Sequence, residues 1–106
     1  MNDIKWTDAE KKVARRAFDA AIERECAAII VELKRSAATV QKAADLWSIH
    51  DYLSDKRAAM DRKYDYRYSQ LIIVFGRLLR ERWIEEADLK GLAEDKLDEI
   101  RRIASF

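Results

Sequence analysis

The feature that most restricts the fold of this chain is its lack of turn-forming residues. Its 106 residues include no proline and only two glycines, Gly76 and Gly91. A β-protein of this size needs many tight turns, and such turns depend on glycine and proline. An all-β fold is therefore close to excluded, and with 49% hydrophobic residues the chain is not disordered by composition. The sequence predicts one small all-α domain with long helices.

Charge and rare residue types exclude several classes of function. The chain has 21 basic and 20 acidic residues, and a net charge of +1 removes the main electrostatic argument for a nucleic-acid partner. A structural zinc site needs about four nitrogen and sulfur ligands. The single cysteine and the single histidine, Cys26 and His50, cannot supply them. No phosphate loop, nucleophile elbow or Cys-x-x-Cys motif is present. We therefore expect no enzyme activity and no cofactor.

The apolar runs are also too short for an integral membrane segment. The longest runs, residues 27–31 and 71–75, fall far below the ~20 residues that span a bilayer. The first six residues are too polar for a signal peptide, and one unpaired cysteine fits a reducing compartment. These features predict a cytoplasmic protein.

The N-terminal third of the chain predicts one long helix. Thr7 and Glu10 have the spacing of a capping box, so the helix is expected to run from Asp8 to about Ala38. Its apolar residues recur about every 3.7 positions, and they are Phe18, Ile22, Cys26, Ile29, Leu33, Ala37 and Val40. Such a helix is roughly 45 Å long, which exceeds the ~26 Å diameter of a compact domain of this size. Part of its apolar stripe is expected to be covered by another chain.

A second helical pattern follows a weakly marked break at residues 36–42. Asp45 is the expected N-cap, and the pattern is expected to break again around residues 61–66 because helix propensity falls there. After Trp83 a brief helix is expected to end at Gly91. A last amphipathic helix is marked by Leu97, Ile100 and Ile103.

Together these patterns predict a single all-helical domain over residues 1–106. It consists of a stalk, an antiparallel pair of long helices over about residues 8–60, and a small helical head over about residues 61–106. The run 71–75 is apolar on all sides, so it belongs either in the deep core or under another chain.

One face of the second stalk helix carries an unusual set of side chains. At 100° per residue, Trp47, His50, Asp51 and Ser54 form a stripe with Arg57 at its edge. Tryptophan and arginine are enriched at interaction hot spots, but a Trp and a His beside an apolar stripe are about as often the edge of a packed core. A catalytic role is disfavoured because sequence neighbours on a helix point 100° apart and no nucleophile accompanies them.

Two charged members of this face are poorly placed to pair with each other. Asp51 and Arg57 are six positions apart, which is neither of the spacings that pair along a helix. An ion pair between Asp51 of one chain and Arg57 of a second chain, across a two-fold axis, would fit this spacing better. The tyrosines at positions 64, 66 and 68 could form a platform on which bases or a polyene stack. More often, such tyrosines lie at the boundary between the core and the solvent.

The central part of the chain contains the run Trp47-x-x-His50-Asp51-Tyr52-Leu53-Ser54-x-Lys56-Arg57. It is followed by Asp61-x-Lys63-Tyr64-Asp65-Tyr66-Arg67-Tyr68-Ser69 and by an apolar run to Leu79. These motifs, with Trp6 before the first helix and the tail segment 92–96, closely resemble the cyanobacterial fluorescence recovery protein family. The likeness covers nearly the whole chain, and the central motif is specific.

The resemblance implies an all-helical homodimer without enzyme activity. Proteins of that family bind the photoactivated, red form of the orange carotenoid protein, chiefly through its C-terminal domain. They speed its return to the orange form and so end non-photochemical quenching at the phycobilisome. The implied location is the cytoplasm, with the cytoplasmic face of the thylakoid membrane as a peripheral site.

The resemblance also implies which residues bind. The family's functional patch falls here on Trp47, His50, Asp51 and Arg57, and it overlaps a dimer interface that includes Leu46. A secondary partner surface in the head is implied at Ile73, Lys96 and Glu99.

The chain departs from the family pattern at several positions. Arg62 and Arg82 stand where the resemblance leads us to expect glycine, Ile73 replaces a phenylalanine and Glu99 a lysine. The stalk sequence thus matches the family pattern more closely than the head sequence does. The alternative functions are a dimeric helical scaffold or regulator with a different protein partner, a nucleic-acid binder, and a carotenoid-binding protein.

Overall fold

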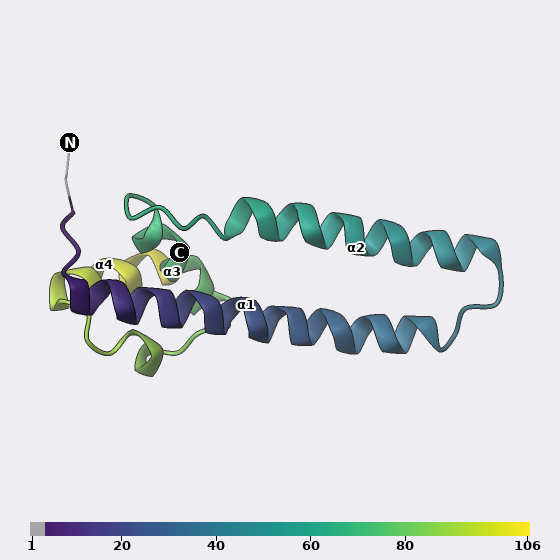
Figure 1. The fold of residues 1–106 in the computed structure, drawn as a ribbon, viewed down its shortest axis with the longest axis horizontal. Helices are drawn as coiled ribbons and strands as arrows, with labels where there is room; N and C mark the ends of the chain where they lie inside the picture. Colours follow the sequence, from purple (N-terminus) through teal and green to yellow (C-terminus); the bar gives the residue numbers. More distant parts are fainter. Residues whose placement is uncertain (1–3) are drawn as a thin grey trace.

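The computed structural model describes residues 4–106, and helices make up its architecture (Figure 1). In chain order these are α1 (Asp8–Ala37), α2 (Ala43–Lys63), α3 (Leu71–Arg80), the 3-10 helix η1 (Glu86–Leu89) and α4 (Glu94–Ala104). Helices α1 and α2 form the antiparallel stalk, and α3, η1 and α4 form the head at one end of it. The molecule measures 53 × 27 × 26 Å. The predicted all-α stalk and C-terminal head are confirmed.

The first helix begins as the capping box predicts. The Thr7 hydroxyl accepts the Glu10 N–H at 3.1 Å, and Glu10 Oε1 accepts the Thr7 N–H at 3.0 Å. These bonds satisfy two amides that the first turn of a helix leaves free. The helix then continues for 30 residues to Ala37.

The expected N-cap of the second helix is wrong by three residues. Helix α2 begins at Ala43, its N-cap is Lys42, and Asp45 occupies the third helical position. The Asp45 carboxylate reaches back and accepts the N–H groups of Gln41 and Lys42 at 3.1 and 3.3 Å. Asp45 therefore stabilises the helix start from within the first turn, where a carboxylate also meets the favourable end of the helix dipole.

The predicted break after the stalk exists, but it covers residues 64–70 rather than 61–66, since α2 ends at Lys63 and α3 begins at Leu71. The connecting tyrosines pack back onto α1 rather than forming an open platform. The Phe18 ring lies edge-on to Tyr64 and Tyr66, with centroids 5.4 and 4.8 Å away, and Trp6 lies 5.8 Å from Tyr68. These aromatic contacts attach the loop to the first helix.

The hydrophobic core lies between the head and the N-terminal half of α1. Its largest fully buried side chains come from the head and are Leu71, Phe75, Leu78, Ile84, Leu89 and Ile100. They pack on a face of α1 that presents buried Ala14, Ala17 and Ala21, and these small side chains let the head approach closely. In the apolar run 71–75 only Ile73 is exposed, so the rest of that run belongs to the core.

The short elements of the head end where the sequence predicted. Helix η1 stops at Leu89, and Gly91 follows with φ of 110°, a conformation that favours glycine. The last helix, α4, buries Ile100 and half-buries Leu97 and Ile103, as its amphipathic pattern predicted.

Arg82 holds a conformation that explains why a glycine is expected there. It has φ of 67° and follows the C-cap of α3, where the Arg82 and Trp83 N–H groups bond to the carbonyls of Leu79 and Leu78. This is a Schellman motif, whose left-handed position is usually glycine.

Replacing Arg82 with glycine should raise the free energy of unfolding by about 0.5–1 kcal/mol, because glycine removes the left-handed strain. Urea denaturation checks this value. Arg62, the other position where glycine is expected, is helical, so Arg62→Gly should instead destabilise by up to about 1 kcal/mol. Equal effects of the two glycines would contradict the explanation.

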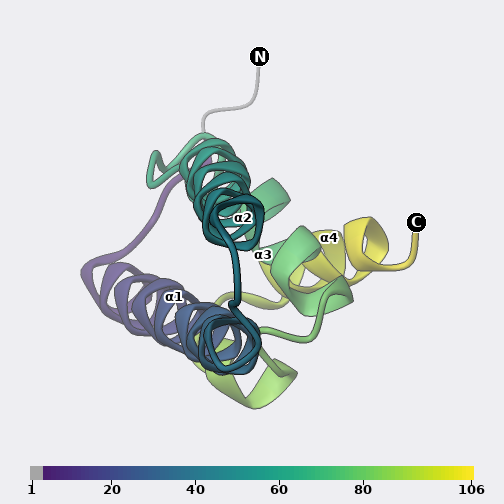
Figure 2. The ribbon, with the colours of Figure 1, turned by 90° about the vertical axis from the view of Figure 1, so that its right-hand side faces the viewer.

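The stalk beyond the head lacks a core of its own. Between residues 22 and 70, all of which the structure describes, the buried residues are the charged Glu25 and Lys63 and no hydrophobic side chain. Viewed from the hairpin end, α3 and α4 lie to one side of the α1–α2 pair (Figure 2). Beyond Phe18, the apolar stripe of the first helix is thus only half-buried or exposed in one chain.

Candidate functional site

The residues singled out on α2 all lie on the surface. Trp47 is 59% and Leu46 52% exposed, and His50, Asp51 and Arg57 are exposed as well. The structure brings three of them together. The Trp47 and His50 rings meet edge-on with centroids 6.0 Å apart, and His50 Nδ1 lies 3.3 Å from Asp51 Oδ1. We refer to Trp47, His50 and Asp51 as the Trp47 cluster.

Arg57 does not join this cluster within one chain. Its Nε donates to both carboxylate oxygens of Asp61 at 3.3 Å. The two side chains remain 82% and 66% exposed, so this pair contributes little to stability and stays accessible to a partner. The absence of an Asp51–Arg57 bond agrees with their spacing. The pairing of Arg57 with Asp61 was not predicted, although their spacing of four residues was a usable signal.

Large hydrophobic side chains are also exposed along the part of the stalk that lies beyond the head. They come from α1, the turn and α2, and they are Ile30, Val31, Val40, Leu46 and Trp47. Several large apolar side chains on neighbouring elements are typical of a protein-interaction surface.

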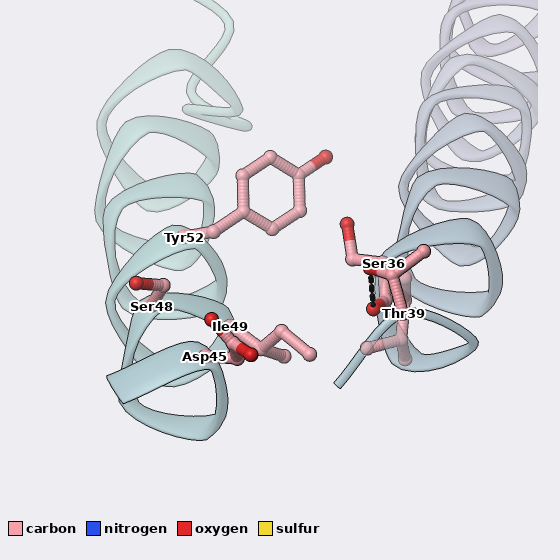
Figure 3. A pocket seen from close by; sticks show the side chains of 7 residues that line it. Ser36, Thr39, Asp45, Ser48, Ile49 and Tyr52 are labelled. Carbon is pink, nitrogen blue, oxygen red and sulfur yellow. Dashed lines mark hydrogen bonds between the residues drawn. The ribbon is translucent and has the colours of Figure 1, made fainter. Parts of the chain in front are cut away.

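Two open cavities separate α1 from α2. The one near the hairpin turn has a volume of about 250 Å³ and is lined by Leu33, Ser36, Thr39, Asp45, Ser48, Ile49 and Tyr52. Figure 3 shows the Ile49 and Tyr52 side chains extending from α2 towards α1, and Ser36 and Thr39 on the opposite side. Here the Thr39 hydroxyl donates to the Ser36 carbonyl at 3.0 Å, so its hydrogen goes to its own helix end.

The second cavity lies nearer the head. It has a volume of about 350 Å³ and is lined by Phe18, Ile22, Cys26, Arg57, Met60, Asp61 and Tyr64. Both cavities show that the two stalk helices do not fill the space between them with their own side chains. This is the physical reason that the stalk beyond residue 21 has no buried hydrophobic residue.

The three head residues differ in accessibility. Ile73 on α3 is 56% exposed. Glu99 on α4 is partly exposed and accepts Arg102 Nε at 3.0 Å. Helices α3 and α4, which carry these residues, lie at the opposite end of the molecule from the start of α2, which carries the Trp47 cluster (Figure 1).

Lys96 is placed differently from the surface position that the resemblance implied. It is 8% exposed, and its Nζ lies 3.1 Å from both carboxylate oxygens of Glu10. Its ammonium is therefore not offered to a partner. Instead it attaches α4 to the first turn of α1, because a buried charge requires a close counter-charge.

Two further properties bear on the class of protein. Among residues 4–106, no group of three or more histidine, cysteine, aspartate or glutamate side chains is arranged to hold a metal ion. Within the same residues, no helix combines the length and the apolar character needed to cross a membrane.

An elongated helical hairpin with an exposed aromatic and charged face is typical of proteins that act by binding another protein. Residues 6–104 match the family model described as photoprotection regulator fluorescence recovery protein. The chain belongs to this family, which is a family of regulators and not of enzymes.

Individual relatives agree with this assignment. The fluorescence recovery protein of Synechocystis sp. PCC 6803 is 37% identical over 99 residues, which cover 93% of this chain and 91% of the relative. The solved structure of the Fremyella diplosiphon fluorescence recovery protein is 40% identical, with a TM-score of 0.90 over 96% of this chain and all of that one. The Synechocystis structure gives 36% identity and a TM-score of 0.90 with the same coverage.

Proposed function

We propose that this protein binds the photoactivated, red form of an orange carotenoid protein and accelerates its return to the orange form, which ends non-photochemical quenching at the phycobilisome. The observation that carries the proposal is the exposed Trp47 cluster with Arg57 nearby on α2 of a chain from this family. The place of action is the cytoplasm, at the cytoplasmic face of the thylakoid membrane.

The proposed working form is a homodimer that covers the stalk. A helix of 21 residues such as α2 gains most of its stability from packing an apolar face, yet α2 buries no hydrophobic residue here. A second copy supplies apolar surface to exposed side chains of the stalk such as Leu46 and Trp47. A two-fold axis would also bring Asp51 of one copy towards Arg57 of the other, because the same patch then faces itself.

The mechanism follows from thermodynamics, since the chain acts without a group that reacts. A binding protein changes the kinetics of a partner only by binding its states unequally. Here the protein holds the two domains of the opened carotenoid protein near their closing geometry. Each ~1.4 kcal/mol of preferential binding to that geometry speeds closure about tenfold. Affinity for the closed product must be lower, so that the protein is released.

The direct test is the dark recovery of a photoactivated orange carotenoid protein, followed by absorbance. Substoichiometric amounts of this protein should speed the decay of the red form, which would demonstrate both activity and turnover. An unchanged decay, with a dimer confirmed by light scattering, would contradict the proposal. That result would favour the alternative of a dimeric helical regulator with a different partner, for which the substitutions at Ile73 and Glu99 in the head are the supporting observation.

A further inference from the structure

The second stalk helix is attached to the rest of the molecule at its last residue. Lys63 is the buried residue of α2. Its Nζ lies 2.7 Å from Glu25 Oε1 on α1 and 2.7 Å from Glu81 Oε1 at the C-cap of α3. One ammonium therefore joins both stalk helices to the head.

The two carboxylates around Lys63 also accept hydrogen bonds from other groups. The Tyr64 hydroxyl donates to Glu25 Oε1 at 2.7 Å, and Arg77 Nε donates to Glu81 Oε2 at 2.8 Å. Burial acts to raise the pKa of Glu81, but the hydrogen bonds from Lys63 and Arg77 outweigh it and hold that pKa below its ordinary value. Two carboxylates thus meet two cations, which is the condition under which buried charges are tolerated.

A buried ionic contact fixes the relative orientation of the elements it joins more effectively than it stabilises the fold. Replacing such a group by apolar side chains is often neutral or stabilising, whereas its hydrogen bonds are short and directional. Elsewhere along the stalk the two cavities separate α1 from α2, so apolar packing does not fix the angle between them. At the head end the buried Lys63 contact restrains that angle, together with the ring contact of Tyr64 with Phe18, while the turn at residues 38–42 joins the two helices at the far end.

We propose that Lys63 is a positioning residue that sets the direction of α2 relative to the head. It thereby fixes the distance between the Trp47 cluster and the head surface around Ile73. Trp47 lies 16 residues before Lys63, about 24 Å along the helix, so a 10° change of direction moves the cluster by about 4 Å. The functional consequence rests on the proposed function and adds to it that the head surface around Ile73 contacts the same carotenoid protein as the Trp47 cluster.

The test uses Lys63→Met, which keeps the aliphatic stem and removes the ammonium. Because this change leaves two buried carboxylates without Lys63, a second variant combines Lys63→Met with Glu25→Gln and Glu81→Gln and so leaves no carboxylate there. The matched control is Lys34→Met, at an exposed lysine of α1. Circular dichroism and thermal unfolding establish that each variant is folded.

The geometric readout is a distance distribution measured by double electron–electron resonance. Spin labels are placed at Asp55→Cys on α2 and Lys90→Cys beside the head, both exposed, in a Cys26→Ser background. Labelled chains are diluted into unlabelled protein so that single protomers are observed. The parent and Lys34→Met should give one narrow distance, and the neutral triple variant should give a broadened or shifted one at unchanged helix content.

The functional readout is the acceleration of dark recovery, which should fall about fivefold or more in the neutral triple variant. A narrow, unshifted distance in that variant would overturn the proposal. A broadened distance with full acceleration would overturn the functional consequence. If the parent itself fails to accelerate recovery, the proposed function fails, while the distance measurement still decides whether Lys63 sets the direction of α2.

Discussion

Replacing Glu10 with alanine is expected to lower the free energy of unfolding by about 3–5 kcal/mol, the largest effect on stability that we predict for one residue. Glu10 is buried and accepts hydrogen bonds from the Thr7 N–H, the Ala93 N–H and the Lys96 ammonium. Its removal leaves a buried ammonium without a counter-charge and detaches α4 from α1. Urea denaturation at neutral pH and fixed protein concentration measures the loss.

Glu23→Ala provides the matched control for this prediction. Glu23 lies on the same helix and is exposed, so its loss should change stability by no more than about 0.5 kcal/mol. Similar losses in the two variants would show that the Glu10 contacts do not carry the effect.

The Glu10 contribution should also depend on pH in a defined direction. Burial acts to raise the pKa of Glu10, but hydrogen bonds from the backbone of Thr7 and Ala93 and from Lys96 lower it below the ordinary 4.5. A carboxyl group with a lowered folded pKa stabilises fully above its unfolded pKa and loses this effect as pH falls through the folded value. The stability difference between parent and Glu10→Ala should therefore be constant above pH about 5.5 and shrink below pH about 4.5. A difference that grows on acidification would contradict the assignment.

Replacing Arg57 with leucine should give the largest functional effect. We expect at least a tenfold loss in acceleration of recovery, in dimer affinity, or in both, with helix content unchanged. Within one chain Arg57 contacts an exposed Asp61, so folding does not depend on it. Absorbance recovery and light scattering over a concentration series measure the two quantities.

Arg62→Leu is the appropriate comparison for Arg57→Leu. Both arginines are exposed on α2 and receive the same substitution, but Arg62 is not a residue of the family motif and lies about three helical turns beyond Asp51. We expect it to retain activity and dimer mass. If Arg57→Leu matches the parent in both measurements, the assignment of this face as the binding site is wrong.

Local features of the fold were predictable because they depend on nearby residues. The capping box at Thr7, the long helix that follows it and the break after the stalk follow from side chains within a few positions of each other. The face that carries the Trp47 cluster follows from the fixed 100° rotation per residue of a helix. The misplaced N-cap at Asp45 was also local, since a carboxylate can cap from the third helical position as well as from the cap itself.

The buried charges could not be assigned from the sequence in the same way. A helical period of 3.6 places Glu10, Ala14, Ala17, Ala21 and Glu25 on one face of α1, and that face is the buried one. This stripe of small residues bounded by two glutamates was a usable signal for the contact with the head. It does not say which cation each glutamate meets.

By itself, the sequence determined the helices, their faces and the family, because these depend on local spacing and on motif identity. Only the tertiary structure decided that Lys96 is a buried partner of Glu10, 86 positions away, and that Lys63 joins Glu25 to Glu81. The physical reason is that such pairs depend on the angle and distance at which helices pack. A change of a few ångströms there separates a buried ion pair from two exposed charges.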